Sequence, residues 1–167
     1  MKLKSLVAAT LAVAAVSGAH AADADWGVHP AAPVLTGAWN PAGSFLDTFS
    51  FSLGSAATVT SSVLSFGNTV GGSYGLWSFG SDNTFGTADD ESLGVWTLST
   101  LPGPATNHVL DLDAGSYYYT VGGRALAGGS AYALSSSVAA VPEPETYALL
   151  AAGLGIVAFV ARRRRDY

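Results

Sequence analysis

The sequence predicts an all-β domain, an antiparallel β-sandwich of two sheets, flanked by one hydrophobic helix at each end of the chain. Between residues 44 and 140, polarity alternates residue by residue in short runs, and no run shows helical periodicity. Serine and threonine are frequent in these runs, and glycine stands at most of their boundaries. About seven short strands at this spacing are typical of a sandwich.

The clearest strand covers residues 45–53, where Phe45, Phe49 and Phe51 share one face and hydroxyl side chains occupy the other. A second strand, residues 58–66, changes phase near Ser61, which predicts a bulge there. Further strands are expected at residues 74–79, 93–98, 108–112, 117–121 and 132–138.

The N-terminus has the layout of a secretory signal. Two early lysines precede an apolar run over residues 6–16, and small residues follow at Ala19 and Ala21. This pattern predicts cleavage by signal peptidase before Ala22. The apolar run is too short to cross a bilayer core of about 30 Å, which disfavours a permanent anchor.

The C-terminus has three parts in a fixed order. Pro142, Glu143 and Pro144 come first, and the two prolines keep the chain extended before an apolar run over residues 147–161. Fifteen residues give a helix of about 22 Å, which is short for a span unless arginines snorkel to the headgroups. A buried core helix with a basic end is the alternative. The basic tail, which we expect to act as a cytoplasmic stop-transfer signal, consists of Arg162, Arg163, Arg164 and Arg165.

This C-terminal order resembles the PEP-CTERM sorting signal of Gram-negative bacteria. The resemblance implies transient insertion in the inner membrane, processing by an exosortase, and a place in the cell envelope or an exopolysaccharide-rich extracellular matrix. A narrower resemblance is to the FxDxF family of PEP-CTERM proteins, because Phe45, Asp47 and Phe49 match its motif. The strand at 47–51 and the hairpin at 112–117 also resemble jelly-roll-like pre-peptidase C-terminal domains.

We therefore divide the chain into six parts. They are a signal peptide (1–21), an N-terminal extended segment (22–43), the sandwich (44–140), the sorting motif (141–146), a transmembrane helix (147–161) and a basic tail (162–167).

Charge and composition exclude several classes of function. Residues 23–140 hold one basic side chain, Arg124, and nine carboxylates, which give a formal charge of −8. A surface of this sign repels phosphate backbones, so we expect no nucleic-acid partner. The chain has no cysteine, which excludes disulfides and thiolate metal sites.

Asp47 is the most unusual candidate, since alternation places its carboxylate on the apolar face of its strand. Such a group needs partners. It is either part of a ligand or metal site or, as we favour, a structural carboxylate held by backbone N–H groups or by Arg124.

A second candidate is an acidic segment that offers oxygen ligands for Ca²⁺. It departs from the EF-hand pattern, with Thr84 and Gly86 at ligand positions, so we favour a solvated acidic turn over an irregular calcium loop. No other cofactor is expected. The candidate ligands are Asp82, Asp89, Asp90 and Glu91.

Aromatic side chains are numerous and are suited either to core packing or to stacking against sugar rings. Tyr118 is of most interest, because alternation turns it away from Tyr117 and Tyr119. A G-x-S-x-G match around Ser73 lacks the strand-to-helix turn of hydrolases, so we expect no enzymatic activity. The sequence thus predicts an exported structural or exopolysaccharide-associated protein, with a calcium- or carbohydrate-binding module as the alternative.

Overall fold

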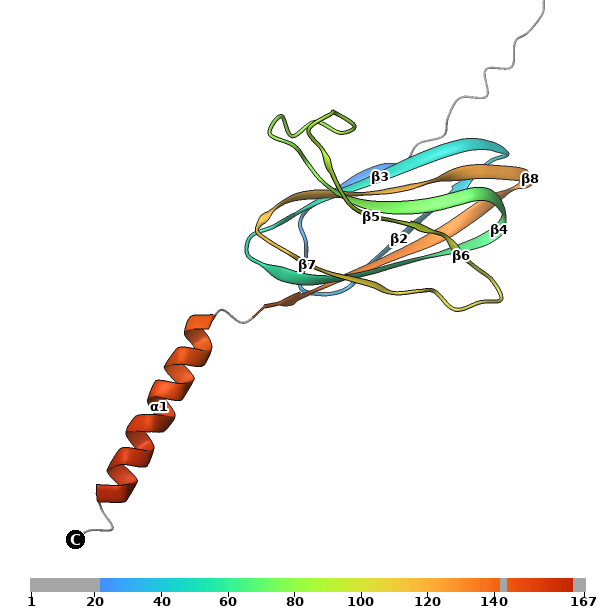
Figure 1. Ribbon diagram of the computed structural model, residues 1–167. Helices are drawn as coiled ribbons and strands as arrows, with labels where there is room; N and C mark the ends of the chain where they lie inside the picture. Colours follow the sequence, from blue (N-terminus) through green and yellow to red (C-terminus); the bar gives the residue numbers. More distant parts are fainter. Residues whose placement is uncertain (1–21, 142–143, 164–167) are drawn as a thin grey trace, which may run out of the picture.

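Strands make up most of the domain in the computed structural model, which describes residues 22–141 and 144–163 (Figure 1). In chain order the strands are β1 (Asp23–Val28), β2 (Val34–Asn40), β3 (Gly43–Leu53), β4 (Ala57–Ser78), β5 (Glu91–Thr97), β6 (Ser99–Thr100), β7 (His108–Leu112) and β8 (Gly115–Ala140). One helix, α1 (Pro144–Arg163), follows them.

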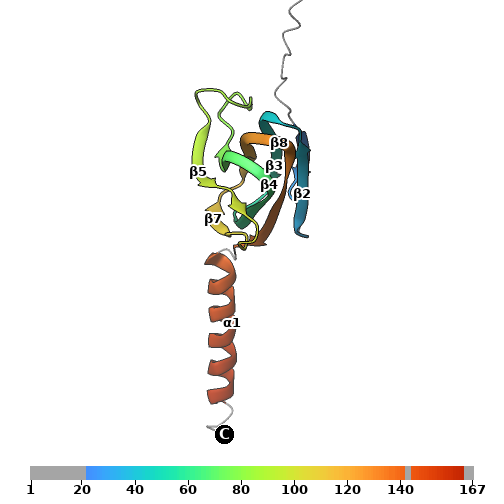
Figure 2. The same cartoon turned by 90° about the vertical axis from the view of Figure 1, so that its right-hand side faces the viewer.

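Two long strands, β4 and β8, build both layers of the domain. Residues 57–67 of β4 pair with residues 130–140 of β8, and residues 69–78 pair with residues 117–125. The first pair carries β2, β6 and β7, whereas the second carries β1, β3 and β5. One continuous sheet is therefore folded over on itself, and Figures 1 and 2 show the resulting two layers.

This arrangement refines the predicted antiparallel sandwich of about seven short strands. Most pairs are antiparallel, but β1 runs parallel to β3 and β6 runs parallel to β4. The bulge predicted near Ser61 is wrong, because the register of β4 and β8 is continuous from Ala57 to Gly67. The shifts lie instead between Gly67 and Ser73, where β4 passes from one layer to the other.

The core lies between the layers and is rich in aromatic rings. Phe45 of β3 stacks on Tyr132 of β8 at 6.2 Å, and Phe51 stacks on Tyr119 at 5.3 Å between centroids. The hydroxyl of Tyr119 lies 3.0 Å from the hydroxyl of Ser136, which belongs to the opposite layer. The predicted inward faces of residues 45–53 and 117–121 are confirmed.

The segment 22–43, expected to be extended outside the sandwich, forms two strands of the sheet. β2 pairs with β8 along its whole length, from Val34 opposite Ser136 to Asn40 opposite Ser130. Trp26 of β1 packs on Phe49 and Phe51. The domain therefore begins at β1 and not at residue 44.

The predicted C-terminal helix is present and extends beyond residues 147–161 at both ends, from Pro144 to Arg163. It projects from the domain (Figures 1 and 2), and its apolar side chains, such as Leu149 and Leu154, are exposed. Over the residues that the structure describes, no helix meets the length and hydropathy needed to cross a membrane. The predicted cleavage residues Ala19 and Ala21, the motif residues Pro142 and Glu143, and the tail residues Arg164 and Arg165 lie outside the described residues.

Candidate functional site

Asp47 is fully buried, and three donors reach its carboxylate. The backbone nitrogen of Ala22 lies 2.6 Å from Oδ1, while Nδ2 of Asn40 and the hydroxyl of Tyr132 lie 3.2 Å and 2.7 Å from Oδ2. A structural carboxylate held by a backbone N–H group is thus confirmed. The proposed role of Arg124 is wrong, because its side chain is exposed on the surface of β8 and does not bond to Asp47.

The acidic segment forms a loop between β4 and β5 whose carboxylates bind its own backbone. Oδ2 of Asp90 accepts hydrogen bonds from the nitrogens of Gly86 and Thr87, and Oδ1 accepts one from Gly80. The hydroxyl of Tyr118, on β8, also donates to Oδ2 of Asp90 at 2.8 Å. These bonds fold the loop onto the outer face of the β3–β8–β4 layer.

The other carboxylates of this loop are held in the same way. Asp89 accepts hydrogen bonds from the hydroxyls of Thr87 at 2.7 Å and Ser81 at 3.0 Å, which lower the pKa of Asp89 to about 2. Oδ1 of Asp82 accepts the N–H of Thr84. Within the described residues, no group of three His, Cys, Asp or Glu side chains is arranged to hold a metal ion. The loop therefore has the geometry of a self-bonded acidic turn.

Tyr118 points away from the core, as predicted, but the acidic loop covers it. Its ring is parallel to that of Trp77, with 6° between the planes, and contacts Phe79 and Phe85 with centroid distances of 4.6 Å and 5.1 Å. Only 3% of Tyr118 is exposed. Tyr118 therefore holds the loop in place and offers little exposed surface to a ligand.

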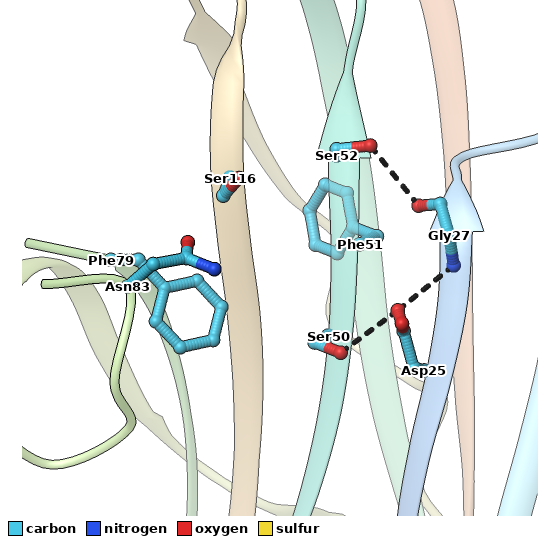
Figure 3. Close-up of a pocket in the computed structure, with 8 residues that line it drawn as sticks. All are labelled: Asp25, Gly27, Ser50, Phe51, Ser52, Phe79, Asn83 and Ser116. Atoms are coloured by element: carbon cyan, nitrogen blue, oxygen red, sulfur yellow. Dashed lines mark hydrogen bonds between the residues drawn. The ribbon is translucent and has the colours of Figure 1, made fainter.

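A groove of about 370 Å³ lies between this loop and the β1–β3 edge. Phe79 and Asn83 line it from the loop side, and Asp25 lines it from β1, with Ser50 and Ser52 of β3 between them (Figure 3). Gly27, Phe51 and Ser116 complete the lining. The groove thus combines an aromatic ring with hydroxyl, amide and carboxylate groups.

Hydrogen bonds fix the polar wall of the groove. Oδ1 of Asp25 accepts the N–H of Gly27 at 2.9 Å and the hydroxyl of Ser50 at 3.0 Å, and these bonds lower the pKa of Asp25. A neighbouring hollow shares Asp25, Ser50 and Phe79 and extends the surface to Phe85, which is 45% exposed. We call the combined surface of these two hollows the loop groove.

The most exposed tryptophan lies on the other layer. Trp39 of β2 is 62% exposed, and both Trp39 and Phe66 of β4 stand opposite Ala131 of β8. Trp26, Trp77 and Trp96 are partly buried. Three of the four tryptophans of the chain therefore pack largely within the domain.

Sequence reasoning missed the residues that form the loop groove. Asp25 lies in the segment predicted to precede the sandwich, and no sequence pattern distinguishes Asn83 and Phe79 from their neighbours. Alternation of Asp23 and Asp25 with apolar residues was the available signal, since it predicts an edge strand with one polar face.

Residues 140–165 match the family model of the PEP-CTERM protein-sorting motif. The chain carries a PEP-CTERM sorting motif. The motif indicates export across the membrane to the envelope of a Gram-negative bacterium and processing by an exosortase. Of the motif residues, Pro144 begins α1, and Arg162 and Arg163 lie in its last turn. The narrower FxDxF assignment stays a prediction.

Two solved structures resemble this protein. One is the pre-peptidase C-terminal domain of a collagenase from Bacillus anthracis, with 17% identity over 73% of this chain and 97% of that chain and a TM-score of 0.47. The other is PliG from Aeromonas hydrophila, a periplasmic inhibitor of g-type lysozyme, with 15% identity over 72% of this chain and 100% of that chain and a TM-score of 0.38. No curated protein matches the sequence.

Proposed function

We propose that this protein is a non-enzymatic component of the envelope or extracellular matrix that binds exopolysaccharide through the loop groove. The observation that carries the proposal is the composition of the groove. Aromatic rings and fixed hydrogen-bonding groups lie side by side on a surface that the fold leaves open (Figure 3).

The chemistry of the loop groove is suited to sugars. A pyranose ring presents a C–H face that packs on an aromatic ring and hydroxyl groups that need polar partners. The exposed ring of Phe85 provides the first kind of contact, and the Asn83 amide and the Asp25 carboxylate provide the second. Since the domain carries a formal charge of −8, neutral or amino-sugar chains are better partners than uronic-acid polymers.

The exposed apolar surface of helix α1 supports the assignment to the envelope. Along α1, large apolar residues leave most of their surface uncovered by the domain, including Leu149 at 74% and Ile156 at 66% exposed. Contact with lipid before the exosortase acts is a favourable environment for these side chains. Cleavage near the Pro142-Glu143-Pro144 segment then separates the domain from this helix.

Binding of the mature protein to exopolysaccharide purified from the native cells tests the proposal. Phe85→Ala removes the exposed ring. We expect the affinity for exopolysaccharide to fall about tenfold, which corresponds to the binding free energy of one aromatic contact. Asn83→Gly removes the amide while tolerating the left-handed backbone at this position, where φ is 50°, and should also weaken binding. The matched control is Trp39→Ala, which removes an exposed ring from the other layer and should leave binding unchanged.

Two results contradict the proposal. One is unchanged affinity in both groove variants. The other is loss of binding only in Trp39→Ala, which would place the glycan on the opposite layer.

A further inference from the structure

Ala22 occupies a defined position at the start of the sheet. Its backbone nitrogen lies 2.6 Å from Oδ1 of Asp47, and its carbonyl oxygen accepts the N–H of Thr48 at 3.3 Å. Asp23 then pairs with Thr48 as the first residue of β1. The nitrogen of Ala22 is therefore directed at a buried carboxylate 25 positions further along the chain.

The carboxylate of Asp47 lacks a compensating charge in the uncut chain. All three of its donors are neutral, and among the described residues no cationic side chain bonds to it. The only basic side chain between residues 22 and 141 is Arg124, which is exposed. A buried carboxylate without a counter-charge is costly, so this site is suited to accept a cation.

Signal cleavage provides that cation at the same atom. The sequence predicts hydrolysis of the bond between Ala21 and Ala22, in which water yields a carboxylate on Ala21 and an ammonium group on Ala22. We propose that Asp47, together with Asn40 and Tyr132, is a binding site for this new α-ammonium group. Maturation thereby converts a neutral hydrogen bond into a buried ion pair.

The ion pair has a structural consequence for β1. β1 is an edge strand whose only strand partner among the described residues is β3, and most of its residues are exposed. The bonds of Ala22 to Asp47 and Thr48 hold the residue directly before the first residue of β1, Asp23. Because β1 carries Asp25, the same bonds fix one wall of the loop groove. The ion pair itself does not depend on whether that groove binds a glycan.

Cutting could stabilise the domain either by creating the ammonium group at Ala22 or simply by removing the signal peptide, here called the leader. The position of the ammonium group distinguishes these two explanations. One additional residue before Ala22 restores a neutral amide at the Asp47 site and moves the ammonium group by about 3.5 Å. A chain with this single extra residue has lost the leader but lacks the ion pair.

The test uses the full chain in detergent, with residues 17–21 replaced by the recognition sequence of a protease that cuts directly before Ala22. We expect the melting temperature to rise by about 5 °C or more on cutting, since a buried charge gains its partner. A second form, cut so that one glycine remains before Ala22, should show less than half of this rise. In the Asp47→Asn variant, cutting should not raise the melting temperature.

Asp111→Asn is the matched carboxylate control. Asp111 is exposed and accepts a hydrogen bond from Thr58, so this variant should keep the full rise. If Asp47→Asn does not fold, acetylation of the α-amine of the cut wild-type protein provides a second measurement, and it should reverse the rise.

An equal rise in the glycine-extended form overturns the proposal, because leader removal and not the ammonium group would then stabilise the domain. A native protein whose first residue is not Ala22, by intact mass, also overturns it. A cut protein that shows the rise but does not bind exopolysaccharide contradicts only the proposed function.

Discussion

Removal of one hydroxyl from the Asp47 site should destabilise the domain measurably. Tyr132→Phe deletes the donor that lies 2.7 Å from Oδ2 of Asp47 but keeps the ring that packs between Phe45 and Phe49. Hydrogen bonds to charged groups contribute about 1.5–3 kcal/mol. Since Asp47 is fully buried and water does not replace the lost donor, we expect a loss of about 2 kcal/mol in the free energy of unfolding.

The same loss can be expressed as a melting temperature. A domain of about 120 residues has an unfolding entropy of about 0.25 kcal/mol/K, so 2 kcal/mol lowers the melting temperature by about 8 °C. Differential scanning calorimetry of the mature protein measures this shift. Tyr117→Phe is the control, because the Tyr117 hydroxyl donates to the neutral carbonyl of Asp113 and its loss should cost only about 0.5–1 kcal/mol.

A double-mutant cycle separates the charge from the hydroxyl. In the Asp47→Asn background, Tyr132→Phe should cost less than half of what it costs in the wild type, because the acceptor is no longer charged. Equal costs in Tyr132→Phe and Tyr117→Phe, or no coupling between positions 47 and 132, would refute the view that Asp47 is an ionised structural group.

Three further predictions concern the core, alkaline pH and calcium. Phe49→Ala, at a core position only 2% exposed, should lower the free energy of unfolding by about 3–5 kcal/mol in urea denaturation. Burial raises the pKa of Tyr74 to about 12, so the folded state keeps this proton when the unfolded state has lost it. The contribution of Tyr74 to stability should therefore be constant up to about pH 10 and then fall by about 1.4 kcal/mol per pH unit up to about pH 12, as measured by melting curves with absorbance at 295 nm. Excess Ca²⁺ should shift the melting temperature by less than about 1 °C, since Asp82 and Asp89 already accept hydrogen bonds within their loop. A larger shift that Asp89→Ala abolishes would indicate a calcium site.

Alternation alone predicted the inward face of β3 and the burial of Asp47, but it misplaced the irregularity in β4. The polar residues Ser61 and Ser65 lie on the inward face with Val59 and Val63, and in the sequence this pattern resembles a change of phase. Buried hydroxyls do not interrupt a strand when they have partners; the Ser65 hydroxyl lies 3.1 Å from that of Thr69. The true register shifts coincide with glycines, where Gly71 has a φ of 61°.

The candidate site was less predictable because it depends on contacts between distant segments. The loop groove brings Asp25 of β1 together with Asn83 of the acidic loop, which lie 58 positions apart in the sequence. Tyr118 is covered by the loop, through its bond to Asp90 and its ring contacts with Phe79 and Phe85, and strand alternation gives no signal for these contacts. Local patterns thus predicted the direction of side chains but not which loop covers them.

The spacing of Phe45, Asp47 and Phe49 has a physical explanation in the structure, because all three side chains contact Tyr132. Phe45 stacks on its ring at 6.2 Å, Phe49 meets the ring nearly perpendicularly at 6.4 Å, and Asp47 accepts the hydroxyl. Alternate residues of one strand lie on the same face, so this spacing presents two rings and one carboxylate to a single tyrosine of the opposite layer. Burial and the bond to Asp47 raise the pKa of Tyr132, which keeps its hydroxyl a donor throughout the neutral range. A leucine at position 47 would leave that hydroxyl without a partner, whereas a carboxylate would also attract the ammonium group that the predicted signal cleavage creates at Ala22.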